Sequence, residues 1–436
     1  MFPRWIGLLT IFLAISACAQ TNTDAVSLGS TRMLLPPAFT TTVPLNDFGN
    51  EATGNFLSYG LVMGTAYNDN VLPEQSTHAI GDNTYSLHPL LTLQNHGTRL
   101  TQQFTYSPGF TIYQRTSALN DVDQHLAESL DERLSENMSV SVEEDLDKSS
   151  NAFSQTENAA QPGVPVFPIS GAVAPYANQL SNTATFGWRY QYGENSLVGA
   201  TGGYALLHYL NPAQSDGLAN TSTADASGFY LHRFAARHYL GAVYQFTQMT
   251  VSPTGVPQLH IRLNAVAGSY TVYFTRSFLF SLTAGPQRLQ LEDSQLPQYE
   301  SWKPWIQANI TWQADRTALT AAYSRTATTG GGLEGIFETD TIGLSGRWQP
   351  APHWTLGAAG GYLESRPETT FLTATGGHGY SFSFLTMRRL SENWNLQFEY
   401  DRLYQRYPGV VAITGNPVSN REAISLSYAI KRHLAQ

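Results

Sequence analysis

Apolar and polar residues alternate along most of this chain, and a helical period is nearly absent. The stretch from Trp394 to Asp401 shows the pattern most clearly. Large apolar side chains occupy every second position there, and amides or carboxylates fill the positions between. Because successive side chains of a β-strand point to opposite faces, the stretch predicts a strand with one apolar, aromatic face and one hydrated face.

The same alternation predicts further strands before and after this stretch. The clearest of them cover residues 56–67, 98–113, 184–192, 240–246, 306–312, 342–348, 354–362, 380–384 and 424–430. Ile261, Leu263 and Ala265 begin another strand, whose phase slips near Gly268 before Tyr270 continues it. An extra residue in one strand would produce such a slip, so we expect a β-bulge near Gly268.

Short and long connections alternate between the predicted strands. Short turns are expected near residues 96, 136, 194, 237, 276, 315, 351 and 392, and longer polar loops such as 211–226, 292–300, 366–377 and 408–420 separate them. Short turns on one side and long loops on the other are typical of bacterial outer-membrane barrels. Eight short turns and nine long loops predict 18 strands, with both ends on the short-turn side.

The segment from Asp121 to Leu134 is ambiguous, because its apolar residues recur every fourth position. That spacing suits an amphipathic helix. It also suits a strand whose apolar face includes Gln124, Glu128 and Glu132. We favour the strand, because the alternation of connections requires one here. Without it, 16 strands become the expected number.

These patterns predict an all-β protein, a transmembrane antiparallel up-and-down β-barrel of about 18 strands. The barrel would face lipid outside and water inside. Five tryptophans near the short-turn ends of strands should form an aromatic girdle at one membrane boundary. They are Trp188, Trp312, Trp348, Trp354 and Trp394. The alternative places them in the core of a soluble β-sandwich.

Composition agrees with an exported membrane protein. Only 13% of residues are charged, against about 25% in ordinary soluble domains. The net charge of -9 argues against a nucleic-acid partner, since such partners require a basic face. We expect a signal peptide at 1–19, a flexible periplasmic segment at 20–54 and the barrel at 55–436. The one cysteine, Cys18, lies in the leader, and its lipidation is the alternative to cleavage after Ala19.

The hydrated faces of the strands predict the wall of a channel, rich in hydroxyl and amide groups with charges of both signs. The predicted pore-lining residues are Arg189, Gln191, Arg262, Gln307, Asn309, Gln313, Arg347, Asn395, Gln397, Glu399 and Asp401. Such a wall suits sugars and other small polar solutes. Sharp ion selectivity would call for a ring of one sign. Trp305 is a candidate for stacking on a sugar ring, or an ordinary rim aromatic.

Two further segments have open interpretations. The proline-containing stretch 151–180 either folds inward to narrow the pore or covers its outer mouth. The stretch 121–147 holds ten carboxylates, which could bind calcium or be solvated. Their spacing matches no calcium loop. No hydrolase elbow, metalloprotease or phosphate-loop motif occurs in the sequence, so we expect no enzyme, no cofactor and no metal site.

Tyr67, Asp69 and Asn70 end the first predicted strand, and Pro89 lies in the middle of the second. This arrangement resembles the start of the β-barrel porin 2 family and of outer-membrane proteins encoded with exopolysaccharide export systems. Asn68 departs from that pattern, because an acid is commonest at its position. The chain also ends in Leu434, Ala435 and Gln436, without the terminal aromatic residue of many outer-membrane barrels. The resemblance implies a passive barrel that could serve polysaccharide secretion.

The sequence therefore predicts a porin-like channel for passive diffusion of polar solutes such as sugars, in the outer membrane of a Gram-negative-type bacterium. Two alternatives remain open: a conduit for exopolysaccharide export, and a structural or adhesive barrel with a closed lumen. The expected partners are membrane lipid and a polar solute or polysaccharide. The oligomeric state is not predicted.

Overall fold

The computed structural model describes residues 55–71, 79–149, 153, 178–211, 217–253, 257–292, 299–368, 376–408, 410 and 418–434. The predicted leader with Cys18, the predicted periplasmic segment and nearly all of the 151–180 loop lie outside these residues. The helical structure within the described ranges is a 3-10 turn, η2 (Ser117–Leu119), and no helix there is long and apolar enough to cross a membrane.

Eighteen β-strands make up nearly all of the described structure. They are β1 (Phe56–Asn68), β2 (Asp82–His96), β3 (Leu100–Tyr113), β4 (Asp121–Arg133), β5 (Met138–Ser149), β6 (Gln179–Tyr192), β7 (Ser196–Tyr209), β8 (Asn220–Ala235), β9 (His238–Ser252), β10 (Leu259–Thr275), β11 (Phe278–Glu292), β12 (Tyr299–Ala314), β13 (Thr317–Thr328), β14 (Phe337–Ala351), β15 (Trp354–Pro367), β16 (Gly377–Arg389), β17 (Trp394–Arg406) and β18 (Val418–His433).

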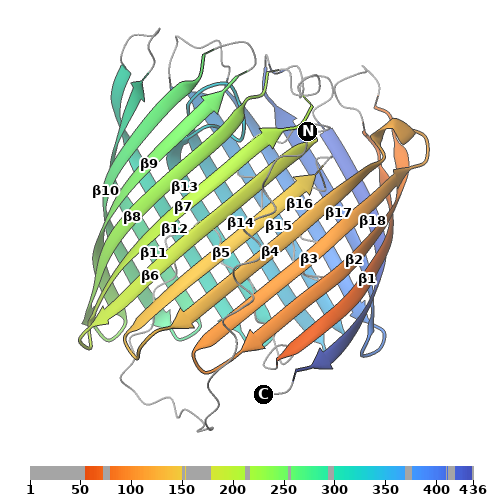
Figure 1. Cartoon of the computed structure of the whole chain (residues 1–436), viewed down its shortest axis with the longest axis horizontal. Helices are drawn as coiled ribbons and strands as arrows, with labels where there is room; N and C mark the ends of the chain where they lie inside the picture. Colours follow the sequence, from red (N-terminus) through yellow and green to blue (C-terminus); the bar gives the residue numbers. More distant parts are fainter. Residues whose placement is uncertain are drawn as a thin grey trace, which may run out of the picture. The chain divides into compact units, whose positions relative to one another are not determined.

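The strands form one closed antiparallel barrel. Each strand pairs with its neighbours in the chain, and β1 pairs with both β2 and β18. The β1–β18 ladder runs without a break from Phe56 opposite His433 to Asn68 opposite Arg421. Closure leaves no sheet edge, so every strand has a partner on both sides. Figure 1 shows these strands inclined to the barrel axis.

The predicted fold class is confirmed, including the strand number of 18. The eight short turns all connect strands at one end of the barrel, which we call the short-turn end, and the opposite end is the loop end. β4 covers the ambiguous segment and pairs with β3 and β5, so the 16-strand alternative is wrong.

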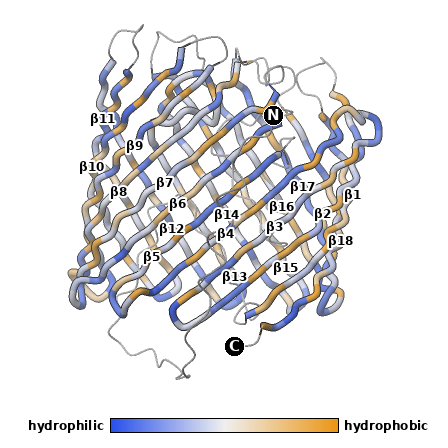
Figure 2. The backbone as a smooth tube through the Cα atoms, in the orientation of Figure 1, coloured by the Kyte–Doolittle hydropathy of each residue, from blue (hydrophilic) through white to orange (hydrophobic). Residues whose placement is uncertain are grey.

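Large apolar side chains on alternate positions face outward. On β1, Tyr59 and Met63 are 52% and 40% exposed, and their partners on β18, Ile430 and Leu426, share that face. Figure 2 shows the alternation of hydrophobic and hydrophilic residues along the strands. An apolar band on the outside is what a membrane-spanning barrel requires, and hydrophobic exposure on this scale would be costly in water.

The outward face of β4 and β5 interrupts this apolar band. Glu128 and Glu144 lie directly opposite each other there, near the middle of their strands. Gln102 on β3 donates to Glu128 (3.4 Å), and Asn182 on β6 donates to Glu144 (3.1 Å). Leucines and glutamates therefore share the outer face of β4 and β5. The side-chain amides of Gln102 and Asn182 offset part of the cost of placing these glutamates there.

The expected bulge near Gly268 is wrong. The β9–β10 register runs unbroken from Leu259 opposite Val251 to Val272 opposite His238. The β10–β11 register shifts between Tyr273 and Thr275, beside the short turn. The apparent phase slip has another cause: the apolar residues in the first half of β10 face the barrel interior, while those in its second half face outward.

Candidate channel lining and constriction

Ten of the eleven predicted pore-lining residues lie on the inner face of the barrel. On β17, Leu396 and Phe398 are exposed on the outside, so Asn395, Gln397 and Glu399 between them point inward. The same register argument places inward Arg189, Gln191, Gln307, Asn309, Gln313, Arg347 and Asp401. Asp401 forms an ion pair with Arg421 of β18 at 3.2 Å. Their contact with a passing solute stays a prediction.

The prediction for Arg262 is wrong. Val266, on the same face of β10, is 59% exposed on the outside. Arg262 forms an ion pair with Glu292 of β11 at 2.7 Å on that outer face. Its neighbours Ile261 and Leu263 are fully buried inside instead. The alternation along β10 correctly separates its two faces, but it does not show which of the two faces lipid.

The five predicted girdle tryptophans lie near the short-turn end. Trp312, Trp348, Trp354 and Trp394 are 36–51% exposed on the outer face. Trp188 is less exposed and stacks on Tyr190, with ring centroids 6.4 Å apart. Arg388 lies over the ring of Trp354 at 5.3 Å. This placement suits an interfacial girdle, and membrane contact of these rings stays a prediction.

A glycine-rich segment folds inward at the loop end. We call residues 329–336, between β13 and β14, the mouth loop. Leu333 in this loop forms an isolated antiparallel bridge with Leu218, just before β8. The amide of Ala219 donates to the carbonyl of Gly332 at 2.7 Å. These contacts join β13–β14 to the β7–β8 wall, several strands away.

Glycine makes this path possible. Gly330 and Gly332 have φ values of +64° and +96°, which residues with a side chain rarely adopt. A Cβ on Gly332 would come within 2.5 Å of the Tyr209 hydroxyl oxygen. Both the backbone conformation and the close approach therefore require glycine at this position.

The mouth loop completes a hydrophobic cluster that joins several walls of the barrel. The cluster contains Tyr209, Leu218, Leu333, Phe337, Leu363, Tyr407 and Val410, with Leu207 packed against it. Burial in this cluster raises the pKa of the Tyr407 phenol above its ordinary range. A dry cluster inside the loop end narrows the passage there, and apolar constrictions of this kind restrict water and ions.

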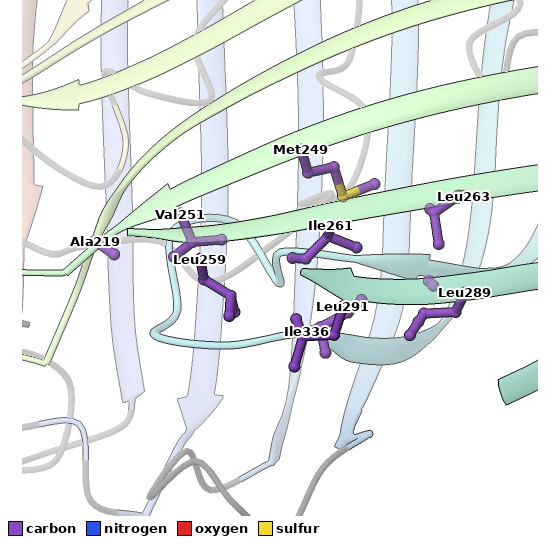
Figure 3. Packing of buried hydrophobic residues seen from close by; sticks show 10 residues of the cluster. Ala219, Met249, Val251, Leu259, Ile261, Leu263, Leu289, Leu291 and Ile336 are labelled. Atoms are coloured by element: carbon purple, nitrogen blue, oxygen red, sulfur yellow. The ribbon is translucent and has the colours of Figure 1, made fainter. Parts of the chain in front are cut away.

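A second hydrophobic cluster covers the loop-end part of the inner face of β9–β11. Ile336 packs in it with inward side chains of the wall, as Figure 3 shows. The wall residues are Met249, Val251, Leu259, Ile261, Leu263, Leu289 and Leu291. Ala219, just before β8, and Ala327 also belong to the cluster. This part of the interior is apolar, in contrast to the hydroxyl- and amide-rich wall that the sequence predicts.

Trp305 fits neither of its two expected roles. It faces inward from β12 and is only 2% exposed. It packs with Val243, Ala265 and Ala267. The indole is therefore part of the inner apolar packing and does not offer an open face to a sugar.

The wall formed by β4 and β5 has the opposite character. Asp123, Asp145 and Asp147 occupy its inner face, two of them at successive inward positions of β5. His125 Nδ1 lies 3.8 Å from Asp147 Oδ1. At the loop end, Asp121 forms an ion pair with Lys148 at 3.4 Å. The loop half of the barrel interior is thus apolar on β9–β11 and acidic on β4–β5.

Phe153 is the one described residue of the loop between residues 150 and 177. It is 7% exposed, and the Arg421 guanidinium of β18 lies over its ring at 6.0 Å. Arg421 points inward from β18, so this side chain lies inside the loop end. The rest of that loop lies outside the described residues, and whether it narrows the pore stays a prediction.

The family-like residues at the end of β1 hold the barrel closed. Both Asp69 carboxylate oxygens accept hydrogen bonds from Asn420, from its amide N (2.7 Å) and its Nδ2 (2.6 Å). Asn70 is buried and donates through Nδ2 to the Val418 carbonyl at 2.7 Å. Tyr67 is exposed on the outer face. The motif therefore fastens the first strand to the last.

Pro89 interrupts the β2–β3 ladder. It faces outward opposite Leu61 of β1. The paired residues of β2 and β3 stop at Leu87–Phe110 and resume at Leu91–Tyr106, and Pro108 occupies the corresponding place on β3. Proline has no N–H to donate to a ladder, which explains the gap.

The inward mouth loop is the main feature that sequence reasoning missed. Its signal is visible in hindsight as Gly330, Gly331, Gly332 and Gly335 around Leu333. An exposed loop has no need for so many glycines, and a leucine flanked by them suggests close packing.

Comparison with family models and with curated proteins finds no match. Among solved structures, OccK2 (OpdF) of Pseudomonas aeruginosa has a TM-score of 0.43 and 9% identity, over 88% of this chain and 99% of that chain. OccAB2 of Acinetobacter baumannii has a TM-score of 0.42 and 12% identity, over 88% and 99%. The siderophore receptor PiuA of A. baumannii has a TM-score of 0.43 and 10% identity, over 88% and 82%. At these scores the likeness adds nothing to the architecture that the strand pairing defines.

Proposed function

We propose that this protein is a porin-like channel of the bacterial outer membrane, through which small polar solutes diffuse. The observation that supports the proposal is a closed 18-stranded barrel with an apolar outer band and with polar or charged inner residues on β17 and β4–β5. Barrels of 16 to 18 strands enclose an aqueous channel unless something fills it.

The mouth loop limits the size of the solute in this proposal. It takes up space at the loop end from the β7–β8 side to β14. The free passage is then the sector beside β1–β6, where the inner wall is polar. Small hydrophilic molecules fit such a passage better than a polymer, so the exopolysaccharide conduit suggested by the family resemblance is the weaker proposal.

The two hydrophobic clusters favour a second candidate function. An interior that is apolar over β9–β11 and bridged by the mouth loop would also suit a barrel with a closed lumen and a structural or adhesive role. Conductance distinguishes the two, because a closed barrel passes no steady current.

The decisive experiment is single-channel recording of the purified protein in planar bilayers. We expect steady steps of current in potassium chloride. Block by a long polysaccharide with free passage of monosaccharides would instead favour the export conduit. Absence of current from correctly folded, heat-modifiable protein would overturn the channel proposal and leave the closed barrel.

A further inference from the structure

The charged residues on the inner face are separated by sign along the barrel axis. In the loop-end halves of the strands, seven inner carboxylates face two cations. The carboxylates are Asp82, Asp121, Asp123, Asp145, Asp147, Asp225 and Asp401, and the cations are Lys303 and Arg421. Asp121 and Asp401 have ion-pair partners, and Lys303 forms an ion pair with Glu368, just beyond β15, at 2.8 Å. The β4–β5 wall therefore carries most of the remaining negative charge.

Near the short turns the sign is reversed. Six inner cations lie within four residues of the short-turn ends of their strands, distributed around the barrel. They are Arg133, Arg189, Arg233, Arg347, Arg389 and Lys431. The inner carboxylates of this half are three: Asp131, Glu143 and Glu399. We call the six cations the basic collar.

Several collar residues have contacts that leave their charge in place. Arg233 donates to the Asn195 side chain through Nε (2.9 Å) and to the Glu194 carbonyl. Arg133 donates to the Thr98 carbonyl at 2.9 Å. The Lys431 ammonium lies 5.1 Å from the centre of the Phe56 ring. Neutral partners hold the side chains without cancelling their field.

The inner wall that carries Asp123, Asp145 and Asp147 also contains buried polar atoms without hydrogen-bond partners among the described residues. Ser107 on β3 lies opposite His125 on the inner face and is 3% exposed. Within the described part of the chain, its hydroxyl has no hydrogen-bond partner, and neither has His125 Nε2. Both residues lie on the same inner wall as Asp123 and Asp147, and the other ring nitrogen of His125, Nδ1, lies 3.8 Å from Asp147 Oδ1. A small polar group with several donors, such as an ammonium ion, would satisfy them.

We propose that the lumen is a bipolar path that favours small zwitterions, solutes that carry an organic cation and an anion together. This inference rests on the proposed channel function. A simple cation is attracted by the acidic wall and repelled by the basic collar, and a simple anion experiences the reverse. A zwitterion is attracted in both zones, because its cationic group can face the acidic wall and its anionic group can face the basic collar. A field fixed along the axis also orients its dipole.

Electrical recording tests the charge layout. In dilute potassium chloride, where screening is weak, currents at equal and opposite voltages through one channel should differ in size. Asp145→Asn with Asp147→Asn should shift the reversal potential toward anions. Arg189→Gln with Lys431→Gln should shift it toward cations. Both double variants should bring the two currents closer to equality.

Glu132→Gln is the matched control. It neutralises a carboxylate of β4 that points outward, opposite Val140, so the reversal potential should not change. A conducting channel whose currents are symmetric, and which neither double variant alters, would overturn the bipolar path while leaving the channel function intact. A protein that folds but passes no current would overturn the channel function itself.

Liposome swelling tests the solute class with three molecules of similar size. Alanine is a zwitterion, lactamide is neutral and lactate is an anion. We expect alanine to enter fastest, and the advantage to fall in both double variants. Equal rates for alanine and lactamide in the unaltered protein would contradict the preference for zwitterions.

Discussion

Strands β10 and β17 have the same kind of alternation, yet they point their apolar residues in opposite directions. On β17, Trp394 and Leu396 face outward, as in a simple barrel. On the first half of β10, Ile261 and Leu263 face inward, and Arg262 faces outward. Ile336 of the mouth loop packs in the same inner cluster as Ile261 and Leu263 of β10. On the β17 side the mouth loop packs only beyond the end of the strand, in the cluster that contains Tyr407. Alternation therefore identifies a two-faced strand, and tertiary contacts decide which face meets lipid.

The largest expected effect comes from removing the cover of β10. Replacing residues 330–336 with a short polar turn would remove Ile336 from the cluster on β10 and Leu333 from its bridge with Leu218, and it would open the loop end. We expect single-channel conductance to rise severalfold. The loop that connects β1 and β2 provides a control, since shortening it at residues 73–77 changes neither the mouth loop nor the residues of its cluster. Unchanged conductance after removal of the mouth loop would show that it does not constrict the path.

Phe337 tests how much the inner packing stabilises the barrel. It is 0% exposed and belongs to the cluster at the loop end. Truncating a buried phenylalanine usually costs about 3–5 kcal/mol, so Phe337→Ala should clearly lower the temperature of heat modification on a gel. Phe398→Ala, on the outer face of β17, is the comparison. Equal losses from the two variants would contradict an inner core.

Asp69→Asn should have an intermediate effect at the junction of β1 and β18. Charge-assisted hydrogen bonds contribute about 1.5–3 kcal/mol, and Asp69 accepts two of them from Asn420. Asparagine keeps the shape and removes the charge. Urea titration in detergent should report a loss within this range. Asp315→Asn, the same change at the exposed short turn between β12 and β13, should not reproduce it.

The smallest effect is expected for Arg262→Gln. This ion pair with Glu292 is nearly half exposed on the outer face, and exposed pairs contribute about 0–1 kcal/mol. Stability and ion selectivity should both stay close to those of the unaltered protein. A marked change in ion selectivity would indicate that Arg262 faces the lumen. The apolar residues of β10 would then face outward, as those of β17 do.

Much of the fold was predictable because its signals are local. Short turns such as that at Asp315 and Arg316, and alternation as in residues 394–401, depend on neighbours in the sequence. The strand number then followed from counting connections. Even β4, with Glu128 among its leucines, was assigned correctly through this count and not through its own residues.

The interior could not be predicted in the same way, because its contacts join distant segments. Leu218 and Leu333 are brought together only by the closed barrel. Inversion of a strand's two faces leaves its alternation unchanged, which explains the error for Arg262 and the false bulge at Gly268. The sign separation of the inner charges likewise depends on knowing which end of each strand lies at the short turns.

The junction between β1 and β18 has a consequence for biogenesis. Asn420 and Asp69 are 351 positions apart in sequence, and the strands that carry them are the first and last of the sheet. Until the C-terminal strand has been delivered, β1 has an unpaired margin with exposed backbone donors and acceptors. Such a margin can pair with another chain, so the chain is open to wrong pairing until the barrel closes. The contact of Asn420 with Asp69 requires β18 to lie beside β1, so it is present only in the closed barrel.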